Sequence, residues 1–262
     1  MERKRIRLDL DAVPTRYHGI INNYAVYDSS CSPFATVYFI DNADGLYLKK
    51  SARGTLSQQN IMTRYFNSLG LTSCVLDYLQ TEDFDWLLTE RVRGEDCTYH
   101  TYLSAPERLC DTLAFLLREL HETDYRDCPV KNRMDSYYDT AYENYKKREY
   151  DTSYFLGSDK LKDVDDIWSF AQDGREELKN DTLLHGDYCL PNIMLDDWRF
   201  SGFIDLGSGG VGDRHVDLYW GAWTLNFNLK TDIYRERFFD AYGRDKIDPH
   251  KIELVSAFEV FG

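Results

Sequence analysis

The sequence predicts an α+β fold in two lobes, a β-rich N-terminal lobe over residues 1–93 and a mainly helical C-terminal lobe over residues 94–262. Two patterns indicate this division. Short runs of β-branched and aromatic residues, separated by turn residues, dominate the first ninety positions. Beyond Gly94 the apolar residues recur at helical spacing. We expect the lobes to join at a hinge at about residues 89–94.

The first lobe is expected to hold a small sheet and one helix. A hairpin is predicted around the polar residues 41–45, because β-branched and aromatic residues stand on both sides of this turn. A weakly amphipathic segment over residues 55–69, followed by Gly70, predicts the helix and its end. The predicted strands are residues 36–40, 46–49, 74–79 and 86–89.

The second lobe is expected to be built mainly of helices. In the clearest one, leucines recur at 3.6-residue spacing up to about Thr123. Ser104 and Glu107 stand at its start in the pattern of a capping box, with a proline between them. Residues 182–206 differ, because short apolar runs broken by Gly, Pro and Asp predict strands that flank an active-site loop. Further helices are predicted at residues 135–149, 160–178, 214–228, 231–242 and 249–260.

The charges are distributed unevenly between the lobes. The chain has 31 Lys and Arg against 45 Asp and Glu, a formal net charge of −14. Residues 1–93 hold 11 basic and 11 acidic residues, so the whole excess lies in residues 94–262. This pattern argues against a nucleic-acid partner, which would favour a basic patch. It suits a cationic ligand for the second lobe, and the alternative is that an acidic surface aids solubility.

The composition excludes several classes of protein. With 43% hydrophobic and 29% charged residues, the chain is neither disordered nor collagen-like. No apolar run approaches the ~18 residues of a membrane-spanning helix, and the charged N-terminal segment does not match a secretory signal. The six cysteines form no CxxC pair, which favours reduced thiols. We therefore expect a cytoplasmic protein without a membrane partner, acting as a monomer or weak dimer.

Two motifs in the loop region carry the chemistry. One is Leu184-His185-Gly186-Asp187-Tyr188-Cys189-Leu190-Pro191-Asn192, with HxDxxxxN spacing, and the other is Phe203-Ile204-Asp205-Leu206-Gly207. Phosphoryl transfer needs a carboxylate that orients the attacking hydroxyl and accepts its proton, and Asp187 suits this role. It also needs oxygen ligands for Mg²⁺, which the Asn192 amide and the Asp205 carboxylate would supply. Taken alone, each motif has a structural alternative, such as a hydrogen-bonded core histidine.

HGDYCLPN followed by GFIDLG resembles the aminoglycoside phosphotransferases of the 3′-hydroxyl type, the kanamycin kinase family, which are relatives of the protein kinases. GLYLKK, WLLTERVRG, DRHVDL and DAYG match further landmarks, so the similarity runs from about Cys31 to Phe261. The resemblance implies a two-lobed protein-kinase-like fold, with Mg²⁺ and ATP or GTP as phosphate donor. It also implies transfer of the γ-phosphate to a hydroxyl of a cationic aminoglycoside, and hence antibiotic resistance.

The resemblance also assigns the nucleotide side of the site. It implies that Lys49 contacts the α- and β-phosphates and that the loop containing Ser32 covers them. That loop lacks the glycines of the protein-kinase loop. Backbone groups of Thr89, Glu90 and Val92 would bind the nucleobase at the hinge.

The helix after the lysine strand departs from the family pattern. Kinase-like folds pair this lysine with a glutamate, but no Asp or Glu occurs between Asp44 and Asp77. Gln58 or Gln59 stands at the expected place. A neutral amide accepts a hydrogen bond from Lys49 without supplying a counter-charge, so the bond is weaker than a charge-assisted one.

The acceptor side departs as well. The DLG motif continues with Ser208 where relatives often have arginine, and Glu259 is the carboxylate of the tail AFEVFG. Asp151 is the other expected acceptor carboxylate. The helix after the metal loop has Trp223, Asn226 and Asn228 where relatives often place acids. We expect this tryptophan to pack in the core, and an aromatic surface for a cationic sugar is the alternative.

Three functions follow from these patterns. The leading one is a kinase that phosphorylates aminoglycosides, with Asp187 as its catalytic residue. A kinase of the same fold for choline, an amino acid or a sugar is the first alternative, because acceptor carboxylates are missing. The second alternative is a pseudokinase that binds nucleotide without transfer, because the helix acid is missing. A protein kinase is disfavoured, since residues 208–212 leave no room for an activation segment.

Overall fold

The computed structural model describes residues 4–157 and 163–262, and the chain forms two compact units. Unit 1 comprises residues 1–93 and the segment 201–207. Unit 2 comprises residues 94–200 and 208–262. The segment 201–207, which the sequence places in the second lobe, thus groups with the first unit.

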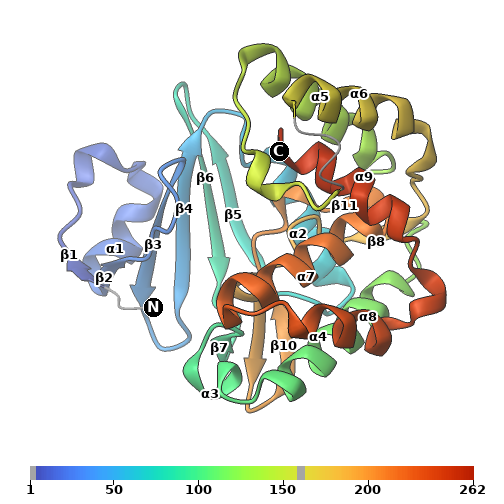
Figure 1. Ribbon diagram of the computed structural model, residues 1–262. Coiled ribbons are helices and arrows are strands. Elements are labelled where there is room, and N and C mark those ends of the chain that lie inside the picture. The colour runs from blue at the N-terminus through green and yellow to red at the C-terminus, as the bar shows by residue number, and fades with distance from the viewer. Residues whose placement is uncertain (1–3, 158–162) are drawn as a thin grey trace. The chain divides into compact units, whose positions relative to one another are not determined.

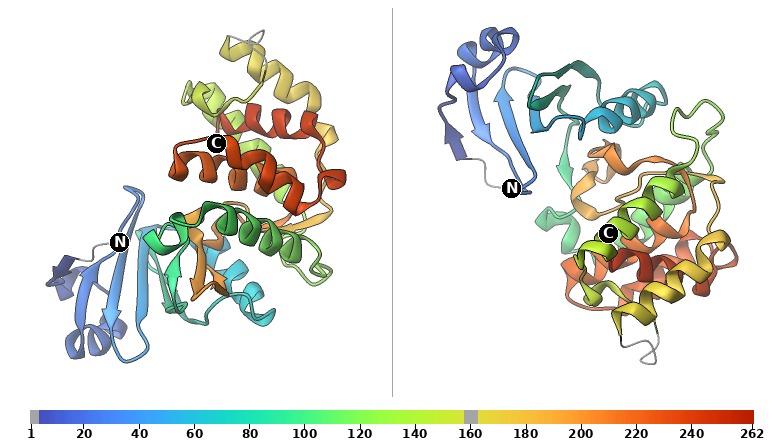
Figure 2. Two further views of the ribbon diagram at one scale, coloured as in Figure 1. Left: turned by 60° about the horizontal axis from the view of Figure 1, so that its bottom comes forward. Right: turned by 90° about the horizontal axis from the view of Figure 1, so that it is seen from above.

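Unit 1 is built on a six-stranded antiparallel sheet with the strand order β1-β2-β3-β4-β6-β5, and its strands lie side by side in Figures 1 and 2. The four strands predicted from the sequence are confirmed, while β1 and β2 were not predicted. The strands are β1 (Lys4–Ile6), β2 (Ala25–Asp28), β3 (Ala35–Asp41), β4 (Leu46–Ala52), β5 (Val75–Gln80) and β6 (Phe84–Glu90).

The two faces of this sheet serve different purposes. Leu46 and Leu48 of β4 are buried in a core cluster that includes Ile21 of α1 (His18–Asn23). Lys49 follows on the opposite face, because successive strand residues alternate between faces. There it pairs in register with Leu87 of β6, which packs in a separate apolar cluster. The alternation therefore turns the lysine away from the main core of unit 1.

The predicted helix over residues 55–69 is confirmed as α2 (Ser57–Ser68). Its start is held by the fully buried carboxylate of Asp85 in β6, whose Oδ2 accepts a hydrogen bond from the Leu56 amide at 3.0 Å. The other oxygen, Oδ1, accepts one from Gln80 Nε2 at 3.0 Å. Asp85 thus ties the first turn of α2 to the sheet and sets where the helix presents its side chains.

The segment 201–207 is joined to unit 1 by local bonds. The Phe203 amide donates to the Leu71 carbonyl at 2.8 Å, and the Thr72 hydroxyl donates to the Phe203 carbonyl at 2.6 Å. The Phe203 ring packs edge-on against Phe66 of α2, with 6.3 Å between the ring centroids. These contacts place Asp205 in the same unit as the lysine strand.

Unit 2 is mainly helical, and α5, α6 and α9 lie side by side around a core that includes Phe258 (Figures 1 and 2). The predicted helices are confirmed within a few residues. Of the one predicted at residues 160–178, residues 160–162 lie outside the described residues. The helices are α3 (His100–Leu103), α4 (Pro106–His121), α5 (Arg133–Lys147), α6 (Val164–Gly174), α7 (His215–Leu229), α8 (Ile233–Tyr242) and α9 (Pro249–Glu259).

Short strands flank the loop over residues 185–192, as the sequence predicts. They form a three-stranded sheet in the order β10-β9-β7 and a two-stranded sheet of β11 and β8. The loop connects β8 to β9 through a 3₁₀ turn at Leu190–Asn192. The strands are β7 (Glu95–Asp96), β8 (Thr182–Leu184), β9 (Ile193–Asp196), β10 (Arg199–Phe203) and β11 (Gly210–Gly212).

The predicted capping box at Ser104 is wrong. Its hydroxyl donates to the Thr101 carbonyl at 3.0 Å, and its amide donates to the His100 carbonyl at 2.9 Å. Ser104 therefore closes the short helix α3, which the sequence did not predict. Helix α4 begins at Pro106, and the residue before it, Ala105, has no capping side chain. Proline suits the first helical position, because its fixed φ matches the helix and it leaves one fewer amide hydrogen without a partner.

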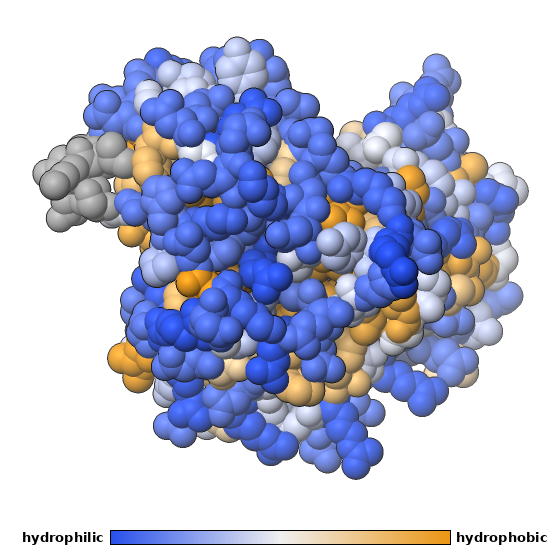
Figure 3. Space-filling model, turned by 90° about the vertical axis from the view of Figure 1, so that its right-hand side faces the viewer, coloured by the Kyte–Doolittle hydropathy of each residue, from blue (hydrophilic) through white to orange (hydrophobic). Residues whose placement is uncertain are grey.

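The surface agrees with the polar composition. Hydrophilic residues cover most of the face shown in Figure 3, where the apolar areas are small and separate. Among the described residues, none of the helices is both long enough and apolar enough to cross a membrane.

Asp85→Ala should destabilise unit 1 by about 1–3 kcal/mol, because the buried Leu56 amide and the Gln80 side chain lose their acceptor. Asp85→Asn keeps one acceptor oxygen and should cost less. The urea concentration at the unfolding midpoint measures both effects. An unchanged midpoint for Asp85→Ala would show that the carboxylate does not hold α2.

Candidate active site

The loop that carries the HxDxxxxN motif is fixed by a buried carboxylate at the start of α7. Asp217 is fully buried, and its Oδ2 and Oδ1 accept the amides of His185 and Gly186, each at 2.8 Å. Its Oδ2 also lies 3.2 Å from His121 Nε2. Burial lowers the pKa of His121, which keeps that ring neutral. Asp187 follows directly after the two anchored amides, so its backbone position is set by Asp217.

Gly186 is required by the same geometry. Its φ is +83°, in the left-handed region that favours glycine. A Cβ at this position would lie 1.9 Å from the Ser208 carbonyl oxygen. A residue with a side chain at position 186 would therefore clash with the backbone of Ser208 unless the loop or that backbone moved.

Asp187 and Asn192 are brought together at the end of this loop. Asn192 Nδ2 donates to Asp187 Oδ2 at 2.8 Å and to the Asp187 carbonyl at 3.0 Å. A carboxylate only accepts hydrogen bonds, so it selects the amide nitrogen and turns the Asn192 oxygen away from it. Burial raises the pKa of the Cys189 thiol between them, which disfavours a thiolate nucleophile. The pair therefore offers an oriented carboxylate and a neutral oxygen ligand.

In unit 1, Lys49 is held between two oxygen atoms. Its Nζ donates to Gln59 Oε1 at 2.9 Å and to Asp205 Oδ1 at 2.8 Å. Of the two glutamines left open by the sequence, Gln59 thus occupies the partner position. The counter-charge comes from Asp205, which the sequence assigned to the metal only. The neighbouring Lys50 instead stands over the Phe84 ring, 3.9 Å from its centroid.

Asp205 retains surface for a cation. Its side chain is 49% exposed, whereas that of Lys49 is 19% exposed. Its φ is +58°, a left-handed conformation that aspartate adopts more readily than most residues. Carboxylate and amide oxygens are the ligand types that Mg²⁺ prefers, and Asp205 and Asn192 each have one of them. The two belong to different units, and no cluster of three acidic, His or Cys ligands occurs within the described residues.

The three residues predicted to bind the nucleobase are not equivalent. Thr89 pairs in the ladder with Tyr47 of β4. The Glu90 amide donates to the Cys74 carbonyl at 3.0 Å, and the Glu90 carbonyl accepts the Ser73 hydroxyl at 2.6 Å. The Val92 amide and carbonyl, by contrast, make no hydrogen bond to any described residue. Val92 is thus the residue whose backbone can offer a donor and an acceptor to a base.

The predicted phosphate loop is held by side-chain bonds to the backbone. Ser32 is exposed, and its hydroxyl accepts the Phe34 amide at 3.2 Å. The Ser51 hydroxyl of β4 donates to the Phe34 carbonyl at 2.9 Å. These bonds tether a glycine-free loop to the strand that contains Lys49.

The two predicted acceptor carboxylates have opposite environments. Asp151 is exposed, and its Oδ1 accepts the Ser153 amide at 2.9 Å. Glu259 is 7% exposed, and its Oε1 accepts both Tyr137 Oη and Trp220 Nε1 at 2.9 Å. Burial raises the pKa of Glu259 to about 7, and the negative charge of Asp187 also raises it, against these two hydrogen bonds. The protonation state of Glu259 therefore changes near neutral pH.

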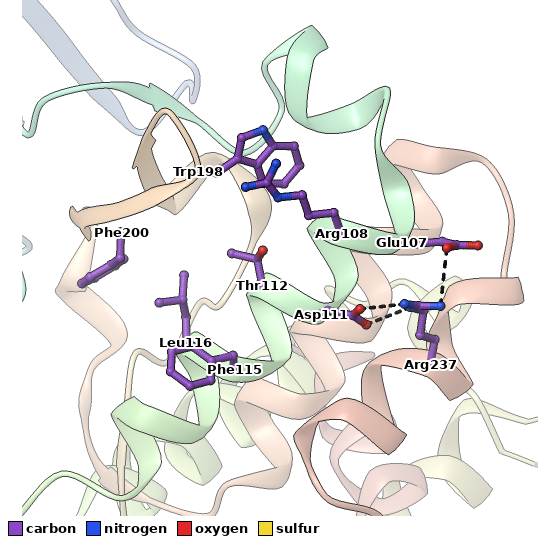
Figure 4. Close-up of a pocket in the computed structure, with 9 residues that line it drawn as sticks. All are labelled: Glu107, Arg108, Asp111, Thr112, Phe115, Leu116, Trp198, Phe200 and Arg237. Atoms are coloured by element: carbon purple, nitrogen blue, oxygen red, sulfur yellow. Dashed lines mark hydrogen bonds and ion pairs between the residues drawn. The ribbon is translucent and has the colours of Figure 1, made fainter.

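A hollow of about 600 Å³ in unit 2 lies elsewhere (Figure 4). It is bordered by α4, where Arg108 stacks on Trp198 at 4.2 Å, and by α8, where Arg237 pairs with Asp111 at 2.6 Å. None of the predicted site residues lines it. The hollow is therefore separate from the candidate active site.

Asp217 is the functional residue that the sequence reasoning missed. The motif DRHVDL was noted only as a landmark, without a role for its last aspartate. A usable signal was present, because Asp217 is the acidic residue in the otherwise apolar helical run VDLYWGAWTL. A carboxylate in a buried helix must find hydrogen-bond donors, and the loop amides are those donors.

Comparison with known proteins gives a consistent result. A family model described as the phosphotransferase enzyme family matches residues 33–255. A probable aminoglycoside 3′-phosphotransferase of Lactococcus lactis is 45% identical over 259 residues, which cover 99% of this chain and 98% of the relative.

Two solved structures share the fold and confirm the predicted fold class. A crystal structure of an aminoglycoside-3′-phosphotransferase of type VIII matches with a TM-score of 0.74 at 22% identity, covering 97% of both chains. An aminoglycoside phosphotransferase from Streptomyces rimosus, in complex with ADP and streptomycin, has a TM-score of 0.68 at 21% identity. That match covers 87% of this chain and 91% of the other.

The raised pKa of Glu259 predicts a pH-dependent stability. The folded protein holds this proton more tightly than the unfolded chain does, so stability is full at low pH and is lost as pH rises towards about 7. Glu259→Gln should remove this loss. Its free energy of unfolding, relative to that of the wild type, should therefore rise by roughly 2–4 kcal/mol from pH 4.5 to pH 8. Thermal unfolding at several pH values measures it.

Asp151→Asn changes an exposed carboxylate and serves as the control. Above pH 5 its Tm should vary with pH as that of the wild type does. A constant difference in Tm between wild type and Glu259→Gln across this range would show that Glu259 titrates normally.

Proposed function

Because the chain belongs to the phosphotransferase enzyme family, we propose that it transfers the γ-phosphate of a nucleoside triphosphate to a hydroxyl of an aminoglycoside. Phosphorylation of the drug would confer resistance, and the cytoplasm, where the nucleotide is made, is the proposed location. The observation that carries this proposal is the Asp187–Asn192 pair, held in the HxDxxxxN loop by the buried Asp217.

Asp187 is the proposed catalytic residue. A hydroxyl attacks phosphorus only when it is oriented and can lose its proton, and a carboxylate serves both needs. The Asn192 amide fixes Oδ2 of this carboxylate at 2.8 Å. The position of Asp187 therefore does not depend on the acceptor, which needs only to bring a hydroxyl within hydrogen-bond reach.

Asn192 and Asp205 are the proposed Mg²⁺ ligands, through the amide oxygen and the carboxylate. The ion, when bound with the nucleotide, neutralises the charge of the phosphate oxygens. In this chain Asp205 also pairs with Lys49 at 2.8 Å, so the lysine helps to hold the carboxylate in place.

Lys49 and Val92 are the proposed contacts to the donor nucleotide, with the Ser32 loop over its phosphates. The lysine ammonium would pair with the α- and β-phosphates while Gln59 accepts one of its hydrogen bonds. The Val92 amide and carbonyl would bind the edge of a purine, which either ATP or GTP provides.

The structure favours a working kinase over a nucleotide-binding pseudokinase. The pseudokinase alternative rested on the missing helix acid, which would leave the lysine without a counter-charge. Asp205 supplies that charge, and Asp187 and Asn192 are both present and oriented. The names of the relatives likewise favour an aminoglycoside as acceptor over choline, an amino acid or a sugar.

Nucleotide consumption by the purified protein tests the proposal. Kanamycin or neomycin should support turnover with ATP or GTP, whereas choline, serine and glucose should not. Asp187→Asn should lower kcat by ~100- to 10,000-fold, because the acceptor proton loses its base. Turnover of a metabolite with no aminoglycoside turnover would refute the acceptor class. No transfer to any acceptor, with equal nucleotide binding by wild type and Asp187→Asn, would favour the pseudokinase.

Lys49→Ala should lower kcat/KM at least ~100-fold, or ~2.7 kcal/mol, because the phosphates lose their ammonium. Gln59→Ala should cost less than ~10-fold, since Asp205 still pairs with the lysine. Lys50→Ala, one residue along the strand and on the other face, is the matched control and should retain activity. If Lys49→Ala and Lys50→Ala behave alike, Lys49 has no specific role.

A further inference from the structure

One face of α7 places aromatic side chains beside the catalytic loop. Trp220, Trp223, Thr224 and Phe227 are spaced three and four residues apart, so they lie along one side of the helix. The Thr224 hydroxyl accepts the amide of Leu190 in the catalytic loop at 3.1 Å. This bond shows that the side of α7 which carries the aromatic residues faces the loop that positions Asp187.

The same face contacts Glu259 of α9, which runs beside α7 (Figure 1). Trp220 Nε1 donates to Glu259 Oε1 at 2.9 Å, and the negative charge of Asp187 is one of the causes that raise the pKa of Glu259. Trp223 packs on Trp220, with 5.3 Å between ring centroids. The aromatic side chains thus continue along α7 from the Trp220–Glu259 hydrogen bond.

The outer end of this face is exposed. Phe227 is 54% exposed and stacks on Trp223, with 4.9 Å between centroids and 11° between ring planes. Tyr154 packs on Trp223 at 5.7 Å, from the turn that follows Asp151. Joined apolar rings at the surface, on a helix face that is bonded to the catalytic loop, are characteristic of a ligand-binding surface.

An ammonium group of the protein itself stands on this surface. Lys230 Nζ lies 4.3 Å from the centroid of Phe227. Because the stacked Trp223 covers one face of the Phe227 ring, the lysine occupies the other face. The ring therefore binds a cation in a geometry that an amine of a ligand could adopt.

We propose that Trp220, Trp223 and Phe227 form one wall of the acceptor site, and that Phe227 binds an ammonium group of the aminosugar where Lys230 Nζ stands in this structure. The proposal rests on the proposed function, because it concerns the acceptor of that reaction. It assigns recognition of the acceptor to aromatic rings, because the one carboxylate of α7, Asp217, is fully buried and already accepts the loop amides.

The chemistry of an aminoglycoside suits such a wall. An aminosugar ring has an apolar C–H face that packs on an indole, and its ammonium groups are attracted to the face of an aromatic ring. Glu259 is a buried carboxylate on this side, and Tyr137 and Trp220 already donate to it. Displacement of Lys230 would exchange one cation for another without a change in charge at the ring.

The test varies kanamycin at saturating ATP. Phe227→Ala should raise the KM for kanamycin ~3- to 10-fold, with kcat and the nucleotide KM unchanged. Trp223→Ala should also raise the KM for kanamycin, whereas Trp223→Phe should keep the KM close to that of the wild type. Lys230→Met should lower the KM for kanamycin, because the competing cation is removed, whereas Lys230→Arg should match the wild type.

Phe115→Ala is the matched control, because Phe115 is 50% exposed in the same unit and has Arg118 over its ring at 5.9 Å. Its KM for kanamycin should not change. If wild type phosphorylates kanamycin and Phe227→Ala keeps its KM within twofold, the aromatic wall is refuted and the proposed function stands. If Lys230→Met raises the KM, Lys230 is itself a binding group and the displacement is refuted. If wild type phosphorylates no aminoglycoside, both proposals fail.

Discussion

The buried carboxylate of Asp217 is the constraint on which the catalytic half of unit 2 depends. A charge inside a protein is stable only when hydrogen bonds replace its hydration. Here the replacements are the amides of His185 and Gly186, with His121 beside them. The need of one carboxylate for donors thus fixes the backbone immediately before Asp187. Asp217 thus ties the first turn of α7 to the loop after β8. Asn192 then orients the Asp187 side chain by a hydrogen bond to its carboxylate.

In unit 1 the main electrostatic feature is the charge partner of Lys49. This lysine has no acidic partner on α2, and Gln59 replaces that partner with a neutral oxygen. Asp205 supplies the missing charge from the segment 201–207, which is bonded to α2 and its following turn. One carboxylate therefore serves the lysine and is also the proposed metal ligand. The departure from the family pattern is compensated within the same unit.

Much of the fold could be predicted because its signals are local. The leucine spacing of α4 and the hairpin of β3 and β4 each depend on residues close in sequence, and both are confirmed. Short elements such as α1 and α3 were missed, since fewer than two turns hold too little periodicity. The capping box failed at Ser104 because α3 ends where α4 begins, and the serine serves the first helix. A capping pattern in sequence cannot tell which of two adjoining helices it belongs to.

The sequence by itself determined the chemistry, because phosphoryl transfer needs few residue types at a fixed spacing, and HxDxxxxN with DLG supplies them within 23 residues. Only the tertiary structure decided the partners. In the folded chain Gln59, not Gln58, accepts the hydrogen bond from Lys49. The Glu90 amide is hydrogen-bonded, whereas that of Val92 is not bonded to any described residue. Asp217 accepts the amide of His185 in the catalytic loop. Each of these depends on contacts between residues distant along the chain. Such contacts follow from packing and burial, which no local pattern of residues records.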